Sequence, residues 1–156
     1  MKAPTLAMLL FALAACAPKE TAVTDPTPPP APVTKNEAVP APTPSGVTQR
    51  FTQADNGRTF TVPVGSRFAV ELVGVPTAGY VWQVDEKPAF LSPAQETSGN
   101  TTTAQSQPGF TGGNHWEVFT FTADSAGEGK LKLGQRRPWE KNEPASQTFQ
   151  VTIKAQ

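Results

Sequence analysis

The chain has 156 residues, no formal net charge, one cysteine and one histidine. This length suits one small domain with extra segments, and neutrality argues against a nucleic-acid partner held through phosphate contacts. The single cysteine leaves no disulfide, and no His, Cys, Asp and Glu cluster has metal-ligand spacing, so we expect neither a metal nor a cofactor.

The N-terminal residues have the layout of a secretory signal. Lys2 precedes an apolar run over residues 6–13, which is too short to span a bilayer as a helix. The sequence LAAC at positions 13–16 resembles the lipobox of bacterial lipoproteins, in which the cysteine is acylated after cleavage. That resemblance implies a signal peptide over residues 1–15 and lipidation of Cys16. The alternative is a plain signal peptide that is cut nearby.

The residue after the cysteine bears on the location of the protein. Many Gram-negative lipoproteins that stay in the inner membrane have aspartate at this position, whereas this chain has Ala17. The resemblance therefore implies a protein of the bacterial cell envelope, held by its N-terminal lipid, with the outer membrane as the expected destination.

Residues 16–45 are expected to form a disordered linker after the lipidated cysteine. Nine of the 17 prolines lie here, and no aromatic residue does. Such a segment buries too little apolar surface to offset the entropy lost on ordering, and proline keeps it extended at roughly 3 Å per residue. The folded domain is therefore expected over residues 46–156.

Residues 46–156 contain short alternating apolar runs and no helical apolar period. The runs are rich in Val, Phe and Thr and are bounded by Gly, Pro, Asn or Asp. This pattern predicts an all-β sandwich or barrel. The expected strands cover residues 58–64, 67–73, 80–84, 117–123, 129–134 and 148–153.

Alternation along these strands predicts which side chains fill the core, because successive residues point to opposite faces. Trp82 is expected at its centre. The predicted core-facing residues are Phe68, Val70, Leu72, Tyr80, Trp82, Val84, Phe119, Phe121, Leu131, Leu133, Phe149, Val151 and Ile153.

Three glycine-rich or polar stretches interrupt the strand pattern, at residues 74–80, 109–116 and 134–144. Alternate loops of a sandwich gather at one end, and loops presented by a rigid scaffold are common binding surfaces. We therefore expect a loop cluster that serves as a binding site.

Motifs in these three stretches resemble a known family. Pro-Thr-x-Gly-Tyr-x-Trp occupies residues 76–82, a Gly-Gly pair precedes a Phe-x-Phe strand within 112–121, and Arg-Pro-Trp-Glu occupies 137–140. Together they resemble the chagasin family, whose loops read Asn-Pro-Thr-Thr-Gly-Tyr, Gly-x-Gly-Gly and Arg-Pro-Trp. The resemblance covers about residues 59–153 and implies an immunoglobulin-like antiparallel β-sandwich with three loops clustered at one end.

The resemblance also implies a function. Chagasin-family proteins inhibit papain-like cysteine proteases, so it implies a monomeric protein that is not an enzyme and blocks the protease cleft reversibly and without covalent chemistry. The residues implied to contact the protease are Pro76, Thr77, Ala78, Gly79 and Tyr80 in the first loop, Phe110, Thr111, Gly112 and Gly113 in the second, and Arg137, Pro138 and Trp139 in the third.

Three positions depart from the family pattern. Val75 stands where the family usually has Asn, Ala78 stands in place of the second Thr, and Phe110 replaces the first Gly of the second loop. The third loop matches fully.

Two other functions compete with inhibition. An enzyme would need a catalytic set such as His115, Asp124 and Ser125, but no nucleophile elbow or other local signature supports one. A lipid-anchored binding module for a carbohydrate or an envelope partner would share the fold and differ only in its target. Trp139 and Phe110 would also suit a sugar.

Overall fold

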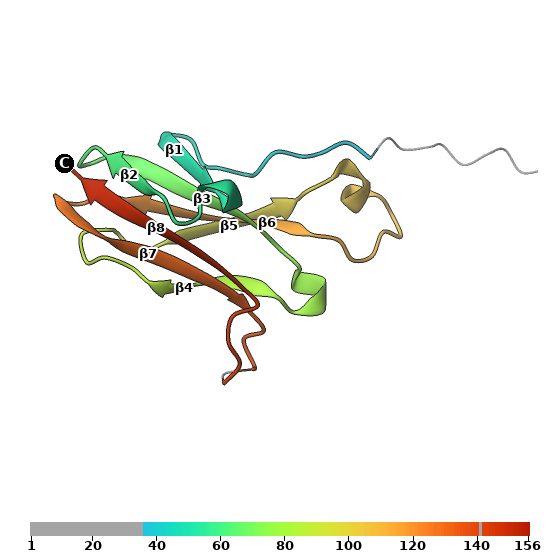
Figure 1. Cartoon of the computed structure of the whole chain (residues 1–156). Helices are drawn as coiled ribbons and strands as arrows, with labels where there is room; N and C mark the ends of the chain where they lie inside the picture. Colours follow the sequence, from blue (N-terminus) through green and yellow to red (C-terminus); the bar gives the residue numbers. More distant parts are fainter. Residues whose placement is uncertain (1–35, 141) are drawn as a thin grey trace, which may run out of the picture. The chain divides into compact units, whose positions relative to one another are not determined.

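The computed structural model describes residues 36–140 and 142–156, which form two β-sheets (Figure 1). One sheet has the strand order β1-β3-β6-β5 and the other β2-β8-β7-β4, so the predicted all-β sandwich is confirmed. In the described residues the strands are β1 (Val47–Thr52), β2 (Thr59–Val62), β3 (Arg67–Gly74), β4 (Val81–Glu86), β5 (Gln95–Asn100), β6 (His115–Thr122), β7 (Gly127–Arg136) and β8 (Gln147–Ala155). Short 3-10 turns are η1 (Gln53–Asp55), η2 (Pro76–Ala78) and η3 (Thr103–Ser106).

Strand pairing is antiparallel from β3 onward, as an immunoglobulin-like sandwich requires. The two N-terminal strands differ, because β1 pairs with β3 in parallel and β2 pairs with β8 in parallel. They follow one another in the chain yet belong to different sheets, and the chain crosses between the sheets through η1. The crossing ties the edges of the two sheets together.

Apolar side chains from both sheets pack between them, as the alternation predicted. Phenylalanine rings stack within this core, with the centroids of Phe51 and Phe60 4.2 Å apart and those of Phe68 and Phe121 5.5 Å apart. Trp82 is 4% exposed and donates its indole N–H to the carbonyl of Val73 at 3.0 Å. The buried core comprises Phe51, Val62, Phe68, Val70, Leu72, Trp82, Leu91, Phe119, Phe121, Ala123, Leu131, Leu133, Phe149, Val151, Ile153 and Ala155.

The proline-rich segment joins the domain earlier than its composition predicted. Residues 37–45, which we call the strap, form backbone hydrogen bonds with residues 101 and 103, just after β5, and accept hydrogen bonds from side chains of β5 and β6. The expected boundary at residue 46 therefore falls after a segment that is already docked. Extended proline-rich chain suits this role, because its free carbonyls accept hydrogen bonds while its fixed φ lowers the entropy lost on docking. Residues 1–35, including Cys16, lie outside the described residues.

Candidate functional site

The three predicted binding loops leave the sandwich from strand ends that are paired with one another. Gly74, the last residue of β3, lies opposite His115, the first of β6, and His115 also pairs with Asn100 at the end of β5. Val81 at the start of β4 pairs with Arg136 at the end of β7. The loops therefore share one end of the domain, away from the C-terminus (Figure 1). They are the first loop (75–80), the second loop (101–114) and the third loop (137–146).

The first loop is closed by its own backbone. Val75 and Tyr80 exchange two hydrogen bonds, at 3.0 and 3.1 Å. Pro76 opens the η2 turn, and Gly79 ends it with a φ of +83°, a left-handed conformation that glycine adopts without steric cost. Thr77 at the tip is exposed. The sequence thus builds a small, rigid projection rather than an open loop.

Arg137 of the third loop braces the first loop. Its Nε donates to the carbonyl of Ala78 at 3.0 Å, and its guanidinium lies 4.6 Å from the centroid of the Tyr80 ring. A second nitrogen, Nη1, donates to Glu140 at 3.0 Å. The prediction that Tyr80 shares the buried face of Trp82 is wrong: Tyr80 is half-buried because its ring stacks under Arg137 instead of entering the core.

Trp139 lies against the first loop and remains open to solvent. A β-carbon at Gly79 would lie 2.2 Å from the Cη2 atom of the indole ring, so the ring takes the space that a side chain at residue 79 would occupy. Trp139 is 66% exposed, so much of its side chain still faces solvent. Exposed tryptophan on a rigid support is a common interface anchor, and Pro138 beside it is also exposed.

Glu117, which the sequence analysis did not single out, supports the stem of the first loop. Its Oε2 accepts the backbone N–H of Trp82 at 2.7 Å, and its buried Oε1 lies where a β-carbon at Gly74 would stand. Burial raises the pKa of this carboxyl, the Trp82 N–H opposes that shift, and the nearby Glu96 adds to it. A signal was present, because residue 117 shares its strand face with Phe119 and Phe121 and is the carboxylate on that face.

Glu117 also borders an open groove between the edges of the two sheets. The groove has a volume of about 740 Å³ and starts beside Pro76 of the first loop. Charged or titratable groups that line it, besides Glu117, are Lys87, Glu96 and His115.

The second loop is organised by one amide side chain. The Oε1 of Gln105 accepts the backbone N–H groups of Thr101 and Thr102, at 2.7 and 2.9 Å. Its Nε2 donates to the carbonyl of Asn114 at 2.8 Å, which joins the two ends of the loop. Gln105 thereby fixes a long connection that has little apolar content of its own.

The predicted contact residues of the second loop lie at its outer part. Phe110 is 43% exposed, and its ring lies close to Gly113. Thr111 is exposed, and Gly112 has a φ of +86° with open space around the position of a β-carbon. Phe110, which departs from the family pattern, is therefore a surface residue and not part of the core.

The catalytic arrangement considered from the sequence is not assembled. His115 begins β6 at the loop end, whereas Asp124 and Ser125 follow the other end of the same strand. Within residues 36–140 and 142–156, no group of three or more His, Cys, Asp or Glu residues is placed to hold a metal ion. Among these same residues there is no helix with the length and apolarity to cross a membrane.

Comparisons with known proteins identify the family of this chain. A family model described as the chagasin family peptidase inhibitor I42 matches residues 61–153. Amoebiasin-1 of Entamoeba histolytica is 30% identical over 106 residues, which cover 68% of this chain and 98% of that protein. Chagasin of Trypanosoma cruzi is 27% identical over 122 residues, which cover 70% of this chain and 99% of that protein.

Two solved structures share the fold. The crystal structure of the cysteine protease inhibitor EhICP2 from Entamoeba histolytica has a TM-score of 0.59 at 20% identity, and the match covers 71% of this chain and 100% of that one. The solution structure of Amebosin has a TM-score of 0.51 at 30% identity and covers 69% of this chain and 97% of that one. The family match over most of the domain, with these likenesses in sequence and fold, leads to one conclusion: the chain belongs to the chagasin family of peptidase inhibitors.

Proposed function

We propose that the domain is a reversible, non-covalent inhibitor of papain-like cysteine proteases, which acts as a monomer and blocks the active-site cleft with its three loops. The observation that carries this proposal is the first loop, whose exposed tip is braced by Arg137 and Trp139. A protease cleft must admit an extended peptide, and a convex edge of rigid loops fills such a cleft without being threaded through it. Preorganisation lowers the entropy lost on binding.

In this proposal the first loop lies over the catalytic cysteine of the protease. Thr77 supplies a hydroxyl and backbone groups next to the nucleophile, while Pro76 and Gly79 hold the turn in shape. The domain needs no reactive group of its own. Substrate is excluded sterically, so inhibition is competitive and reversible.

The other two loops extend the contact along the cleft. Trp139 supplies a large exposed aromatic surface. Arg137 joins the third loop, which carries Trp139, to the first loop through its hydrogen bond to Ala78. Gly112 and Gly113 allow close approach to another backbone, since neither presents a β-carbon. Phe110 adds exposed apolar area where the family has glycine.

A titration of papain with the full chain tests the proposal, with hydrolysis of a fluorogenic peptide as the readout. We expect reversible inhibition that Trp139→Ala weakens by about thirtyfold, as truncation of an interface anchor costs about 2 kcal/mol or more. The loss should come mainly from faster dissociation. Val64→Ala is the matched control, because Val64 is an exposed apolar residue (45%) outside the loops. A folded chain that leaves papain fully active would overturn the proposal.

We also propose that Cys16 carries lipid and holds the protein in the bacterial cell envelope, at the outer membrane. The support is the sequence LAAC at positions 13–16, which follows an apolar run. Expression in a Gram-negative host with labelled palmitate should give a labelled protein in the outer-membrane fraction. Cys16→Ser should abolish the label, and a wild-type chain without label would contradict the anchor.

A further inference from the structure

Some side chains on the outer face of the β1-β3-β6-β5 sheet are buried although they point away from the core. Ala69 and Glu71 alternate along β3 with core residues, and Val118 and Thr120 do the same along β6. Their exposed fractions are 0%, 9%, 1% and 2%. An outer sheet face that faced solvent would expose such side chains, so another segment must cover it.

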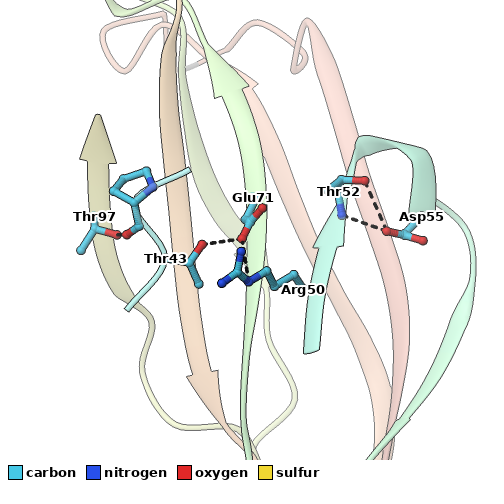
Figure 2. Close-up of polar contacts among 7 residues, drawn as sticks. Thr43, Arg50, Thr52, Asp55, Glu71 and Thr97 are labelled. Carbon is cyan, nitrogen blue, oxygen red and sulfur yellow. Dashed lines mark hydrogen bonds and ion pairs between the residues drawn. The ribbon is translucent and has the colours of Figure 1, made fainter. Parts of the chain in front are cut away.

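The strap runs over this face and supplies the cover. The hydroxyl of Thr97 on β5 donates to the carbonyl of Pro42 at 3.1 Å, and Thr43 donates to the carboxylate of Glu71 (Figure 2). Arg50 of β1 approaches the same carboxylate at 3.5 Å, so Glu71 is paired although it is buried. The contacts reach strands β3 and β5 from one short segment.

One end of the strap pairs with the start of the second loop. The N–H of Val39 donates to the carbonyl of Thr101 at 2.8 Å, and the N–H of Thr103 donates to the carbonyl of Glu37 at 2.9 Å. Ala38 and Thr102 form the antiparallel bridge between these bonds. The strap therefore adds a short ladder to the residues that Gln105 also holds.

Two sheet residues fit the strap closely. The indole N–H of Trp116 donates to the carbonyl of Val39 at 2.7 Å. Gly99 of β5 faces Pro42, whose Cγ would lie 3.1 Å from a β-carbon at residue 99. The absence of a side chain at Gly99 thus lets the proline ring settle on the strand.

We propose that the strap is a positioning element of the inhibitory site, which holds the second loop in its binding conformation. That the strap holds the loop is inferred from the ladder between residues 37–39 and 101–103. That the strap thereby affects inhibition rests on the proposed function. Without the strap, the second loop keeps the Gln105 bonds but loses its backbone partners on the outer side. The sequence that links the domain to its N-terminal segment is then also part of the site.

Gly99→Val in the full chain tests the proposal by pushing Pro42 off the strand. Trp116→Phe is a second variant, which removes the donor to Val39 and keeps an aromatic ring. Ser98→Val is the matched control, because it adds the same side chain on β5 at the next position, which faces away from the strap. Amide hydrogen exchange of residues 101–105, papain inhibition and the melting temperature are measured for each chain.

We expect both variants to speed exchange at residues 101–105 and to weaken inhibition about tenfold through faster dissociation, while Ser98→Val changes neither. Unchanged exchange in both variants would overturn the proposal, and so would faster exchange with unaltered inhibition. A wild-type chain that fails to inhibit papain would defeat the proposed function instead. The exchange data would in that case still decide whether the strap holds the loop.

Discussion

Trp139 and Gly79 lie in different loops, yet the indole ring of Trp139 occupies the space where a β-carbon at residue 79 would stand. The two motifs that carry them are far apart in the sequence and form one structural unit. Arg137 reinforces this unit through Ala78 and Tyr80. The shape of the first loop therefore depends on the third.

Gly79→Ala should damage the loop unit in two ways. A left-handed φ of +83° costs a non-glycine residue about 1–2 kcal/mol, and the new β-carbon displaces Trp139. Gly57→Ala is the control, because Gly57 has a φ of +81° with nothing within 4 Å of a β-carbon. Thermal unfolding should show a loss in both variants, at least as large for Gly79→Ala as for Gly57→Ala, whereas only Gly79→Ala should shift tryptophan fluorescence and weaken papain inhibition. Equal fluorescence and inhibition in the two variants would contradict the packing.

Arg137→Lys should weaken inhibition although it keeps the positive charge. Lysine lacks the planar guanidinium group that donates to Ala78 and Glu140 while it lies over Tyr80, so roughly fivefold in affinity should be lost. Arg58→Lys is a close match, since Arg58 also pairs with a carboxylate three residues away and lies 5.1 Å from a ring, that of Phe60. Inhibition by Arg58→Lys should equal the wild type. An Arg137→Lys chain of full potency would show that charge alone suffices.

Glu117→Gln should change how stability depends on pH. Burial raises the pKa of Glu117 above its usual 4.5, so the folded domain holds this proton more firmly than the unfolded chain. The contribution of this group to stability is therefore most favourable below pH 4.5 and declines as pH rises through the folded pKa. Glutamine still accepts the Trp82 N–H and does not ionise.

Thermal unfolding of both chains between pH 4 and pH 7 checks this expectation. The stability of Glu117→Gln relative to the wild type should rise with pH over this range. Lys87, Glu96 and His115 of the same groove are common to both chains, so the difference between the curves isolates Glu117. A difference that is constant with pH would refute the assignment.

Asp85→Asn should show the opposite dependence. Arg136 binds the Asp85 carboxylate with two nitrogens, one at 2.9 Å, and this hydrogen bonding lowers the pKa of Asp85 below its usual 3.8. The pair therefore adds stability above pH 3.8, which is lost as pH falls through the folded pKa. The variant should be less stable than the wild type by up to about 1 kcal/mol at pH 7, and the gap should close near pH 2. Urea unfolding at pH 7 and pH 2 measures the free energy of unfolding of both chains. The same difference between them at both pH values would exclude the ion pair as the cause of that difference.

Strands with a buried face could be predicted from the sequence, because burial imposes alternation. Phe68, Val70 and Leu72 of β3 and the matching residues of β6, β7 and β8 follow it closely. β1 and β5 escaped prediction. Val47–Thr52 of β1 buries Phe51 alone, and Gln95–Asn100 of β5 is polar and mostly exposed, so both strands take their order from backbone pairing, with β3 and β6 respectively. A strand that is held mainly by backbone hydrogen bonds does not need alternating apolar residues, so its sequence does not reveal it.

The candidate site also has one part that could be predicted from sequence motifs and one part that could not. The loop motifs predicted that Thr77, Gly112 and Trp139 lie at one end of the domain, and Trp139 is exposed there. The strap was missed because proline-rich composition indicates an extended chain but not what lies beside it. Its partners, such as Thr97 and Trp116, are read only from the folded sheet.

The place where the strap meets the second loop has a mechanical consequence. In a chain tethered at its N-terminus, as proposed, tension from the tether enters the domain at Glu37, beside Thr103, at the loop end. A protease held by the loops would pull at that same end. Tension would therefore load the ladder between residues 37–39 and 101–103 before it reached the rest of the strap and β1.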